Sequence, residues 1–157
     1  MTADYSNITT EISQLIDTWE NKLRNLSDNT ISDKRNKQNR TIKQILGHLI
    51  DSASNNHQRM VRLQYNTELT FPDYTQDNDT WIAIQDYQNA DWPNLIQFWK
   101  FYNLHMIHVI KNIDHAKLDH CWHDYEGTCV TLNEMIGGYL FHLNLHLDEI
   151  QNLINKK

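Results

Sequence analysis

Two histidines in the C-terminal part of the chain have the spacing of a metal-binding pair. His142 and His146 are four residues apart, and on a helix such residues lie one turn apart on the same face, with Cβ atoms about 5–6 Å apart. Both imidazoles could then reach one metal ion. Nine histidines in 157 residues give about half of one such pair by chance, so the spacing alone is not specific.

The position of this pair relative to the apolar stripe of its helix makes the metal interpretation stronger. At about 100° per residue, the centre of the apolar face falls near Tyr139, Leu143 and Ile150. His146 lies about 50° and His142 about 90° from that centre, so both lie at the same edge of the stripe. There they could turn into the protein interior. Metal ligands and merely buried or boundary histidines are equally compatible with this pattern.

A third candidate ligand, His48, begins a polar stripe on another helical segment. His48, Ser52, Asn55 and Arg59 follow one another at helical spacing, and His48 lies about 130° from the apolar centre of that segment. The spacing itself favours an ordinary solvent-exposed face. The functional alternative is the wall of a pocket, with His48 facing the pair on the last helix.

The remaining six histidines are weaker candidates. His105 lies at the edge of an apolar stripe and could supply a fourth contact to the metal. His57 falls within an apolar face and is interpreted as a core histidine. We interpret the other four as surface residues, with His123 the best placed to reach the mouth of a pocket; they are His108, His115, His120 and His123.

Four segments must position these side chains, and each repeats apolar residues at the three- or four-residue spacing of a helix. They cover residues of about 5–26, 41–65, 93–113 and 131–154. Thr41 is a plausible N-cap, and Pro93 suits a first helical turn because its missing N–H costs nothing there. Thr131 and Glu134 form a capping-box pattern. The sequence therefore predicts an all-α four-helix bundle in a single domain over residues 1–157.

The segments between these helices differ in character. Residues 27–40 form a polar connection whose basic cluster is interpreted as a solvated loop; the cluster is Lys34, Arg35, Lys37 and Arg40. Residues 66–92 form a long aromatic crossover between the second and third helices, with a short helix expected near 79–88. A second loop covers about 115–130, and negligible strand is expected anywhere.

Composition excludes several classes of protein. Hydrophobic residues make up 39% and charged residues 22%, which is typical of a folded domain rather than a disordered chain. Four glycines and two prolines argue against an all-β fold and a glycine-rich phosphate loop. The net charge of -6 argues against nucleic-acid binding, which depends on neutralising phosphates.

Compartment and redox state are predicted from what the sequence lacks. No apolar run approaches the roughly 18 residues of a membrane span, and the first residues show no leader pattern. We therefore expect a cytoplasmic protein that binds no membrane. Cys121 and Cys129 are too few for a disulfide framework, and we expect both thiols to be reduced.

The chain resembles the DinB superfamily over roughly residues 5–155. The resemblance rests on GHLIDSA followed by NNHQR within residues 41–59, and on TLNEMIGGYLFHLNLHLDEI, which contains the His-x-x-x-His pair. The crossover segment with Phe71-Pro72-Asp73-Tyr74 and Trp81 is also similar. This superfamily is related to the bacillithiol S-transferases and the mycothiol-dependent maleylpyruvate isomerases.

The resemblance implies a divalent metal held by one histidine of the second helix and two of the last. In this sequence these are His48, His142 and His146. The spacing argument finds the last pair by itself, whereas the resemblance is what favours His48. Some members of the superfamily transfer thiols and one isomerises, so the resemblance does not fix an activity.

Three imidazole ligands would leave positions open on Zn²⁺ or Ni²⁺, the arrangement of catalytic rather than structural sites. Asp51, Asp148 or Glu149 could orient a ligand imidazole through its other nitrogen, and Glu149 is the best placed. Arg59 and Tyr139 could hold an anionic or carbonyl group of a substrate.

The sequence thus predicts a metal-dependent hydrolase or thiol S-transferase that acts on a small molecule, with a thiol cosubstrate as one option. We also expect a homodimer. The alternative is a non-catalytic metal-binding or dimerising helical bundle, because no Ser/His/Asp or Cys/His arrangement supplies a nucleophile without the metal.

Overall fold

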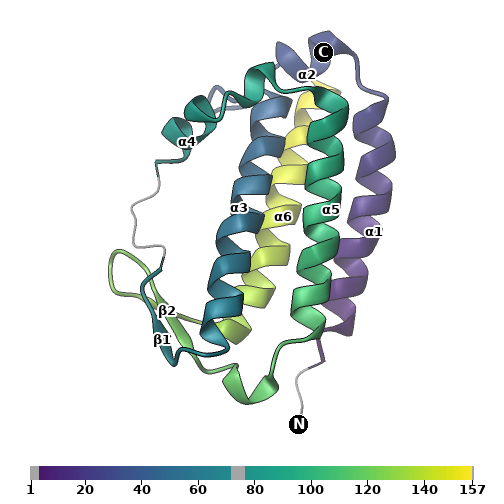
Figure 1. Cartoon of the computed structure of the whole chain (residues 1–157). Helices are drawn as coiled ribbons and strands as arrows, with labels where there is room; N and C mark the ends of the chain where they lie inside the picture. Colours follow the sequence, from purple (N-terminus) through teal and green to yellow (C-terminus); the bar gives the residue numbers. More distant parts are fainter. Residues whose placement is uncertain (1–3, 72–76, 157) are drawn as a thin grey trace.

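Four long helices lie side by side in the computed structural model, which describes residues 4–71 and 77–156 (Figure 1). They are α1 (Ser6–Arg24), α3 (Ile42–Leu63), α5 (Trp92–Lys111) and α6 (Leu132–Asn155). Helices α1 and α6 run in one direction and α3 and α5 in the other (Figure 1). Because α3 and α5 are parallel, the chain must return along the bundle between them. The predicted four-helix bundle with a long crossover is confirmed.

The long helices begin where the sequence offers side-chain acceptors for the free N–H groups of the first turn. Thr41 forms a capping box with Gln44 at the start of α3, and Thr131 forms the predicted box with Glu134 at the start of α6. At the start of α5, Asp91 accepts a hydrogen bond from the backbone of Asn94. These caps fix the register in which each helix presents its apolar face.

The core follows the apolar spacing of the four segments. Ile12, Ile16 and Leu23 of α1 are fully buried, as are Trp99 of α5 and Ile150 of α6. Burial of this kind stabilises a protein by roughly 25 cal/mol for each Å² of apolar surface removed from water. The bundle therefore has an apolar interior that can hold a polar site in place.

Short helical elements occupy the connections. These are α2 (Asp28–Ser32), α4 (Asn78–Ile84), and two 3₁₀ turns at Tyr87–Asn89 and His115–Lys117. The short helix expected near residues 79–88 is present as α4 and the first 3₁₀ turn. The crossover residues Pro72, Asp73 and Tyr74, part of the family resemblance, lie outside the described residues.

The interpretation of the basic cluster as a solvated loop is wrong for Arg40. This side chain is buried, and its guanidinium Nη2 lies 2.8 Å from Oδ1 of Asp79. Its Nε donates to the same oxygen at 2.9 Å. Because Arg40 precedes the cap of α3 and Asp79 lies in α4, the ion pair ties the crossover to the start of α3.

Three short strands are also present, although the sequence predicts negligible strand. They are β1 (Glu68–Leu69), β2 (Cys121–His123) and β3 (Cys129–Thr131). Strand β1 pairs with β2 in parallel, and β2 pairs with β3 antiparallel. Strands of two or three residues are too short to show an alternating apolar pattern. The small sheet lies beside the lower ends of α3 and α6 (Figure 1).

The expectation of reduced thiols is wrong, because Cys121 and Cys129 form a disulfide with a Cα–Cα distance of 5.6 Å. Antiparallel pairing of β2 with β3 brings the two cysteines together. Their pairing depends on the hairpin, which the sequence pattern does not reveal. The disulfide closes the loop that connects α5 to α6.

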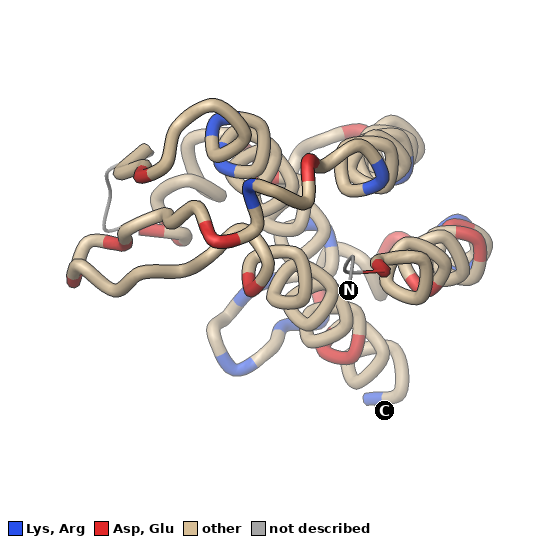
Figure 2. The backbone as a smooth tube through the Cα atoms, turned by 90° about the horizontal axis from the view of Figure 1, so that it is seen from below, with Lys and Arg blue, Asp and Glu red and all other residues tan. Residues whose placement is uncertain are grey.

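Charged residues of both signs are distributed along the tube in the view down the bundle (Figure 2). The hairpin and the crossover project from one side of the helices in the same view. Within the described part of the chain, none of the helices combines the length and apolar character needed to cross a membrane.

Candidate metal centre

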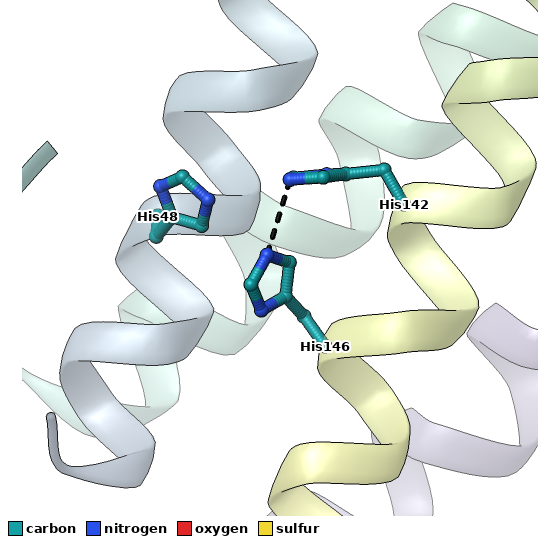
Figure 3. Close-up of side chains that lie close together, drawn as sticks. All are labelled: His48, His142 and His146. Carbon is teal, nitrogen blue, oxygen red and sulfur yellow. Dashed lines mark hydrogen bonds between the residues drawn. The ribbon is translucent and has the colours of Figure 1, made fainter. Parts of the chain in front are cut away.

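The structure brings His48 of α3 together with His142 and His146 of α6 (Figure 3). The ring centroids of His142 and His146 are 4.4 Å apart, and the ring of His48 lies 4.7 Å from His146 and 5.2 Å from His142. Each residue offers one ring nitrogen such that all of these atoms lie within 4.8 Å of one another. Three imidazoles therefore converge on one point between two helices.

Hydrogen bonds on the far side of the α6 rings orient both rings, and the one to Glu149 fixes the tautomer of His146. Nδ1 of His146 is 2.9 Å from Oε2 of Glu149. Because an ionised carboxylate only accepts hydrogen bonds, Nδ1 carries the hydrogen and Nε2 presents a lone pair. Nδ1 of His142 is 3.2 Å from the hydroxyl of Ser52, which can also accept. These contacts orient both Nε2 atoms toward the centre of the cluster.

The distance between the two Nε2 atoms fits a shared metal ion. Nε2 of His142 and Nε2 of His146 are 3.1 Å apart. Two nitrogens bound to one ion at about 2.0–2.1 Å, with an angle between about 90° and 109°, would be about 2.9–3.4 Å apart. Without metal, a hydrogen has to lie between them, and Nε2 of His142 carries it, because the hydrogen of His146 is on Nδ1. A metal ion would replace that hydrogen and satisfy both lone pairs.

His48 adds a buried nitrogen without a partner. Its side chain is almost completely buried, and its Nδ1 makes no hydrogen bond within the described part of the chain. A buried polar atom left unpaired costs about 1–3 kcal/mol. The fit to a metal ion comes instead from the place of the ring, because one nitrogen of His48 lies within 4.8 Å of the ligand atoms of His142 and His146.

Burial keeps two of these rings neutral. Burial, reinforced by the neighbouring His146 and His142, lowers the pKa of His48 from its ordinary value of 6.5 to about 3. Burial and His146 likewise lower the pKa of His142 to about 4. Since only the neutral imidazole binds a metal, both rings are in the binding form at neutral pH.

Of the three carboxylates that the sequence proposes as orienting groups, Glu149 is the one that forms a hydrogen bond with a histidine of the cluster within the described part of the chain. Asp148 is exposed. Asp51 is buried and accepts hydrogen bonds from the hydroxyl of Tyr87 at 2.7 Å and from Nε2 of Gln85 at 2.8 Å. Asp51 therefore ties α3 to the crossover rather than to the metal centre.

A close approach beside His48 depends on Gly47. A Cβ placed on Gly47 would lie 2.2 Å from ring atoms of Tyr87, which is shorter than any real contact. The missing side chain lets the ring of Tyr87 pack directly on the backbone of α3. The hydroxyl of the same tyrosine reaches Asp51 one turn further on. Gly47 thus sets the position of the helix turn that carries His48.

A cavity of about 340 Å³ adjoins the histidines. Residues of α3 form one wall and residues of α6 the other, and the small sheet and α4 complete the lining. The lining residues are His48, Ser52, Asn55, Asn56, Arg59, Asn78, Trp122, Val130, Glu134, Met135, Gly138, Tyr139 and His142. The polar stripe of α3 therefore faces a pocket, and the favoured sequence interpretation of a solvent face is wrong.

Arg59 and Tyr139, the two residues predicted to contact a substrate, both line this cavity but have different interaction partners. The guanidinium carbon of Arg59 lies 3.8 Å from the ring centroid of Trp122, a cation–π geometry. The hydroxyl of Tyr139 donates to Oδ1 of Asn103 at 2.7 Å, and burial raises its pKa. The hydroxyl hydrogen of Tyr139 is therefore used in a hydrogen bond to α5. The guanidinium of Arg59 instead packs on the ring of Trp122.

Trp122 is a cavity residue that the sequence analysis missed. It is the middle residue of β2, after Cys121 and before His123. Helical spacing cannot predict which way a side chain points in a strand of this length. His123, predicted to reach the pocket mouth, does not line the cavity and lies 4.0 Å from Glu68. The neighbouring Trp122 lines the cavity instead of His123.

The histidines of α5 belong to a different group. His105, considered as a fourth ligand, is exposed and lies 4.9 Å from the ring of His57. It is not part of the three-histidine cluster, so the prediction of a fourth contact is wrong. His57 is half-buried rather than in the core, and its Nδ1 lies 3.3 Å from the hydroxyl of Tyr102.

Comparison with known proteins agrees with this architecture. The sequence profile of the DinB superfamily matches residues 11–150. The chain is similar in structure to YfiT from Bacillus subtilis, with a TM-score of 0.78 and 17% identity over 98% of this chain and 89% of that chain. YfiT is described as a probable metal-dependent hydrolase with an unusual four-helix bundle topology. No curated protein matches the sequence.

Proposed function

This chain belongs to the DinB superfamily, and from that premise we propose that it is a metal-dependent hydrolase acting on a small molecule. The observation that carries the proposal is the convergence of His48, His142 and His146 beside a cavity of about 340 Å³. A structural metal would need no such space. The description of YfiT as a probable metal-dependent hydrolase supports the same class of reaction.

The three imidazoles would hold a divalent ion, with Zn²⁺ and Ni²⁺ as the proposed candidates because neutral nitrogen donors suit both. Such an ion, when bound by three protein ligands, polarises a carbonyl oxygen and lowers the pKa of water. Glu149 would keep His146 in the tautomer that presents Nε2, and the hydroxyl of Ser52 can accept the Nδ1 hydrogen of His142 when its Nε2 binds the ion. Losing such supporting contacts commonly lowers metal affinity about 10–100-fold.

The side chains of the cavity would position the substrate. Ser52, Asn55 and Asn56 offer hydroxyl and amide groups along α3, and Trp122 and Met135 offer apolar surface opposite. Polar groups at defined places in a partly apolar pocket fix the orientation of a small molecule. The substrate would lie along α3 with its reactive bond at the histidines.

Two alternatives are weaker on the present observations. Transfer to a thiol would use the same metal centre, but no contact among the described residues favours a thiol over water. A non-catalytic metal-binding bundle would need the same three histidines, yet it gives no reason for a cavity beside them. Hydrolysis therefore accounts for both the three histidines and the cavity beside them.

Metal analysis of purified variants tests the proposal. We expect wild-type protein loaded with Zn²⁺ or Ni²⁺ to retain about one ion per chain after dialysis, and His142→Ala to retain close to none. His115→Ala is the matched control, because His115 is exposed and is not part of the cluster, and it should bind as much metal as the wild type. Equal metal content in His142→Ala and wild type would refute the site.

A further inference from the structure

A second group of histidines lies between α3 and α5, outside the three-histidine cluster. Its closest two members are His57 of α3 and His105 of α5, whose ring centroids are 4.9 Å apart. We propose that these two imidazoles bind a further divalent transition-metal ion, most tightly as Cu²⁺. This site is separate from the metal centre and does not depend on the proposed function.

The two sites lie on opposite faces of α3. His57 is nine residues after His48, which corresponds to about two and a half helical turns and about 14 Å of rise. His48 therefore faces the histidines of α6, whereas His57 faces α5, which lies along the other side of α3 (Figure 1). An ion at one site cannot share its protein ligands with an ion at the other.

The relative placement of His57 and His105 repeats that of two rings in the metal centre. Their planes are 85° apart, with the centroids at 4.9 Å. The rings of His48 and His146 have planes 81° apart and centroids at 4.7 Å. A bound ion lies in the plane of each imidazole, because the nitrogen lone pair lies in that plane. Two nearly perpendicular planes intersect, so one ion can lie in both.

The third histidine of this group has a different orientation. His108 follows His105 by three residues on α5, but the planes of these two rings are only 25° apart and their centroids are separated by 6.2 Å. Nearly parallel, stacked planes do not meet close to both rings. The geometry therefore gives a two-histidine site, and the other coordination positions of the ion are left to water.

The nitrogens of both rings are available to a metal. The hydrogen bond of His57 within the described part of the chain joins its Nδ1 to the hydroxyl of Tyr102 at 3.3 Å. That hydroxyl can accept the Nδ1 hydrogen, and Nε2 then presents a lone pair. Burial, reinforced by His105, lowers the pKa of His57, which favours the neutral form that binds metal. His105 is exposed, so an ion can reach it from solvent.

The donor set indicates the class of metal and the strength of binding. Imidazole nitrogens suit Zn²⁺, Ni²⁺ and Cu²⁺, and affinity for such sites is greatest for Cu²⁺. Two imidazoles at a partly exposed site hold an ion less tightly than three at a buried one. The ion should therefore be lost in the dialysis that tests the metal centre, and its binding has to be measured at equilibrium.

Calorimetric titration with Cu²⁺ tests the inference in metal-stripped His142→Ala/His146→Ala protein, which keeps one histidine of the metal centre. We expect about one tightly bound ion per chain, with two nitrogen ligands in its electron paramagnetic resonance spectrum. Adding His57→Gln or His105→Gln should weaken binding at least about tenfold, since even a supporting contact of a ligand is commonly worth that much. Because His105 is exposed, His105→Gln should fold normally.

His108→Gln in the same protein is the matched control, because His108 is an exposed histidine of the same helix that stacks on His105. It should keep the full affinity for Cu²⁺. An equal loss in His108→Gln, unchanged affinity in both His57→Gln and His105→Gln, or no tight Cu²⁺ at all would overturn the inference. If the wild type retains no metal after dialysis but the His57- and His105-dependent binding is found, the proposed metal centre fails and this inference stands.

Discussion

The two halves of the bundle differ in what they bury. Helices α3 and α6 bury five polar or charged side chains, namely His48, Asp51, Asn55, Arg59 and His146. Helices α1 and α5 bury two, Thr9 and Asn103. Asn103 itself accepts the hydrogen bond of Tyr139 from α6, so even this residue is linked to the site half. Buried polar side chains are thus concentrated on one helix pair, whereas both pairs bury apolar side chains.

This difference bears on how a small bundle tolerates buried polar groups that reduce its stability. Buried polar groups stabilise a fold only when they are fully paired, and the unpaired Nδ1 of His48 shows that pairing is incomplete in the metal-free state. The apolar side chains that α1 and α5 bury, together with those of α3 and α6, must therefore supply stability that offsets the cost of the site. Functional sites commonly violate local packing rules in this way.

The largest expected effect concerns the apolar half. Ile16→Ala removes a fully buried side chain of α1, and we expect a loss of about 2–5 kcal/mol in the free energy of unfolding because a cavity is left behind. Urea denaturation of metal-stripped protein measures it. A loss below about 1 kcal/mol would mean that the α1–α5 half does not supply the stability assigned to it.

Packing against the site helix should give the next largest effect. Gly47→Ala places a methyl group against the ring of Tyr87, and we expect a cost of about 1–3 kcal/mol from overpacking. Gly137→Ala should instead stabilise by about 0.5–1 kcal/mol, because its added Cβ meets nothing and alanine favours a helix. The two variants should move the thermal midpoint in opposite directions, and a shift of the same sign would contradict the close approach.

The histidine cluster should make the metal-free protein sensitive to acid. The folded-state pKa values of His48 and His142, about 3 and about 4, lie below the unfolded value of about 6.5. The unfolded chain therefore binds more protons in this range, so stability is complete above about pH 6.5 and is lost as the pH falls toward 4. Each proton contributes a slope of up to about 1.4 kcal/mol per pH unit.

His48→Leu tests that origin of the acid sensitivity. It should flatten the dependence of unfolding free energy on pH between about 6.5 and 4, whereas His108→Gln, at an exposed position of α5, should leave it unchanged. At pH 7.5 we expect metal-stripped His48→Leu to be at least as stable as the wild type, because leucine needs no hydrogen-bond partner. An unchanged slope in His48→Leu would assign the acid sensitivity to other groups.

The smallest expected effect lies at the surface of the apolar half. Glu20 of α1 is 2.7 Å from Nζ of Lys100 on α5, and hydrogen bonds from Lys100 and Gln97 lower its pKa to about 2. A lowered carboxylate pKa adds stability above about pH 4.5 that is lost as the pH falls toward 2. Since an ion pair at the protein surface contributes little net stability, Glu20→Gln should cost only about 0.2–1 kcal/mol at neutral pH.

The sequence predicts the bundle well because its signals are local. Three- and four-residue apolar spacing marks the long helices, and the Thr131–Glu134 box marks the start of α6. The pair His142 and His146 is visible for the same reason, since one helix carries both. The four long helices could therefore be predicted from interactions within single turns.

The rest of the site depends on contacts between elements, which no local pattern records. His48 lies on the polar side of α3, and only the packing of α3 against α6 turns that side toward a cavity. Trp122 and the disulfide depend on the pairing of β2 with β3. The family resemblance supplied His48, and nothing in the sequence analysis supplied Trp122.

X-ray absorption at the metal edge tests the central claim most directly. Zn²⁺-loaded wild-type protein should show three imidazole nitrogens at about 2.0–2.1 Å, and Zn²⁺-loaded His48→Gln should show at most two, because one ligand comes from α3 and two from α6. Identical spectra for the two proteins, or a wild-type ion bound by oxygen atoms without imidazole, would contradict a metal centre shared by these helices.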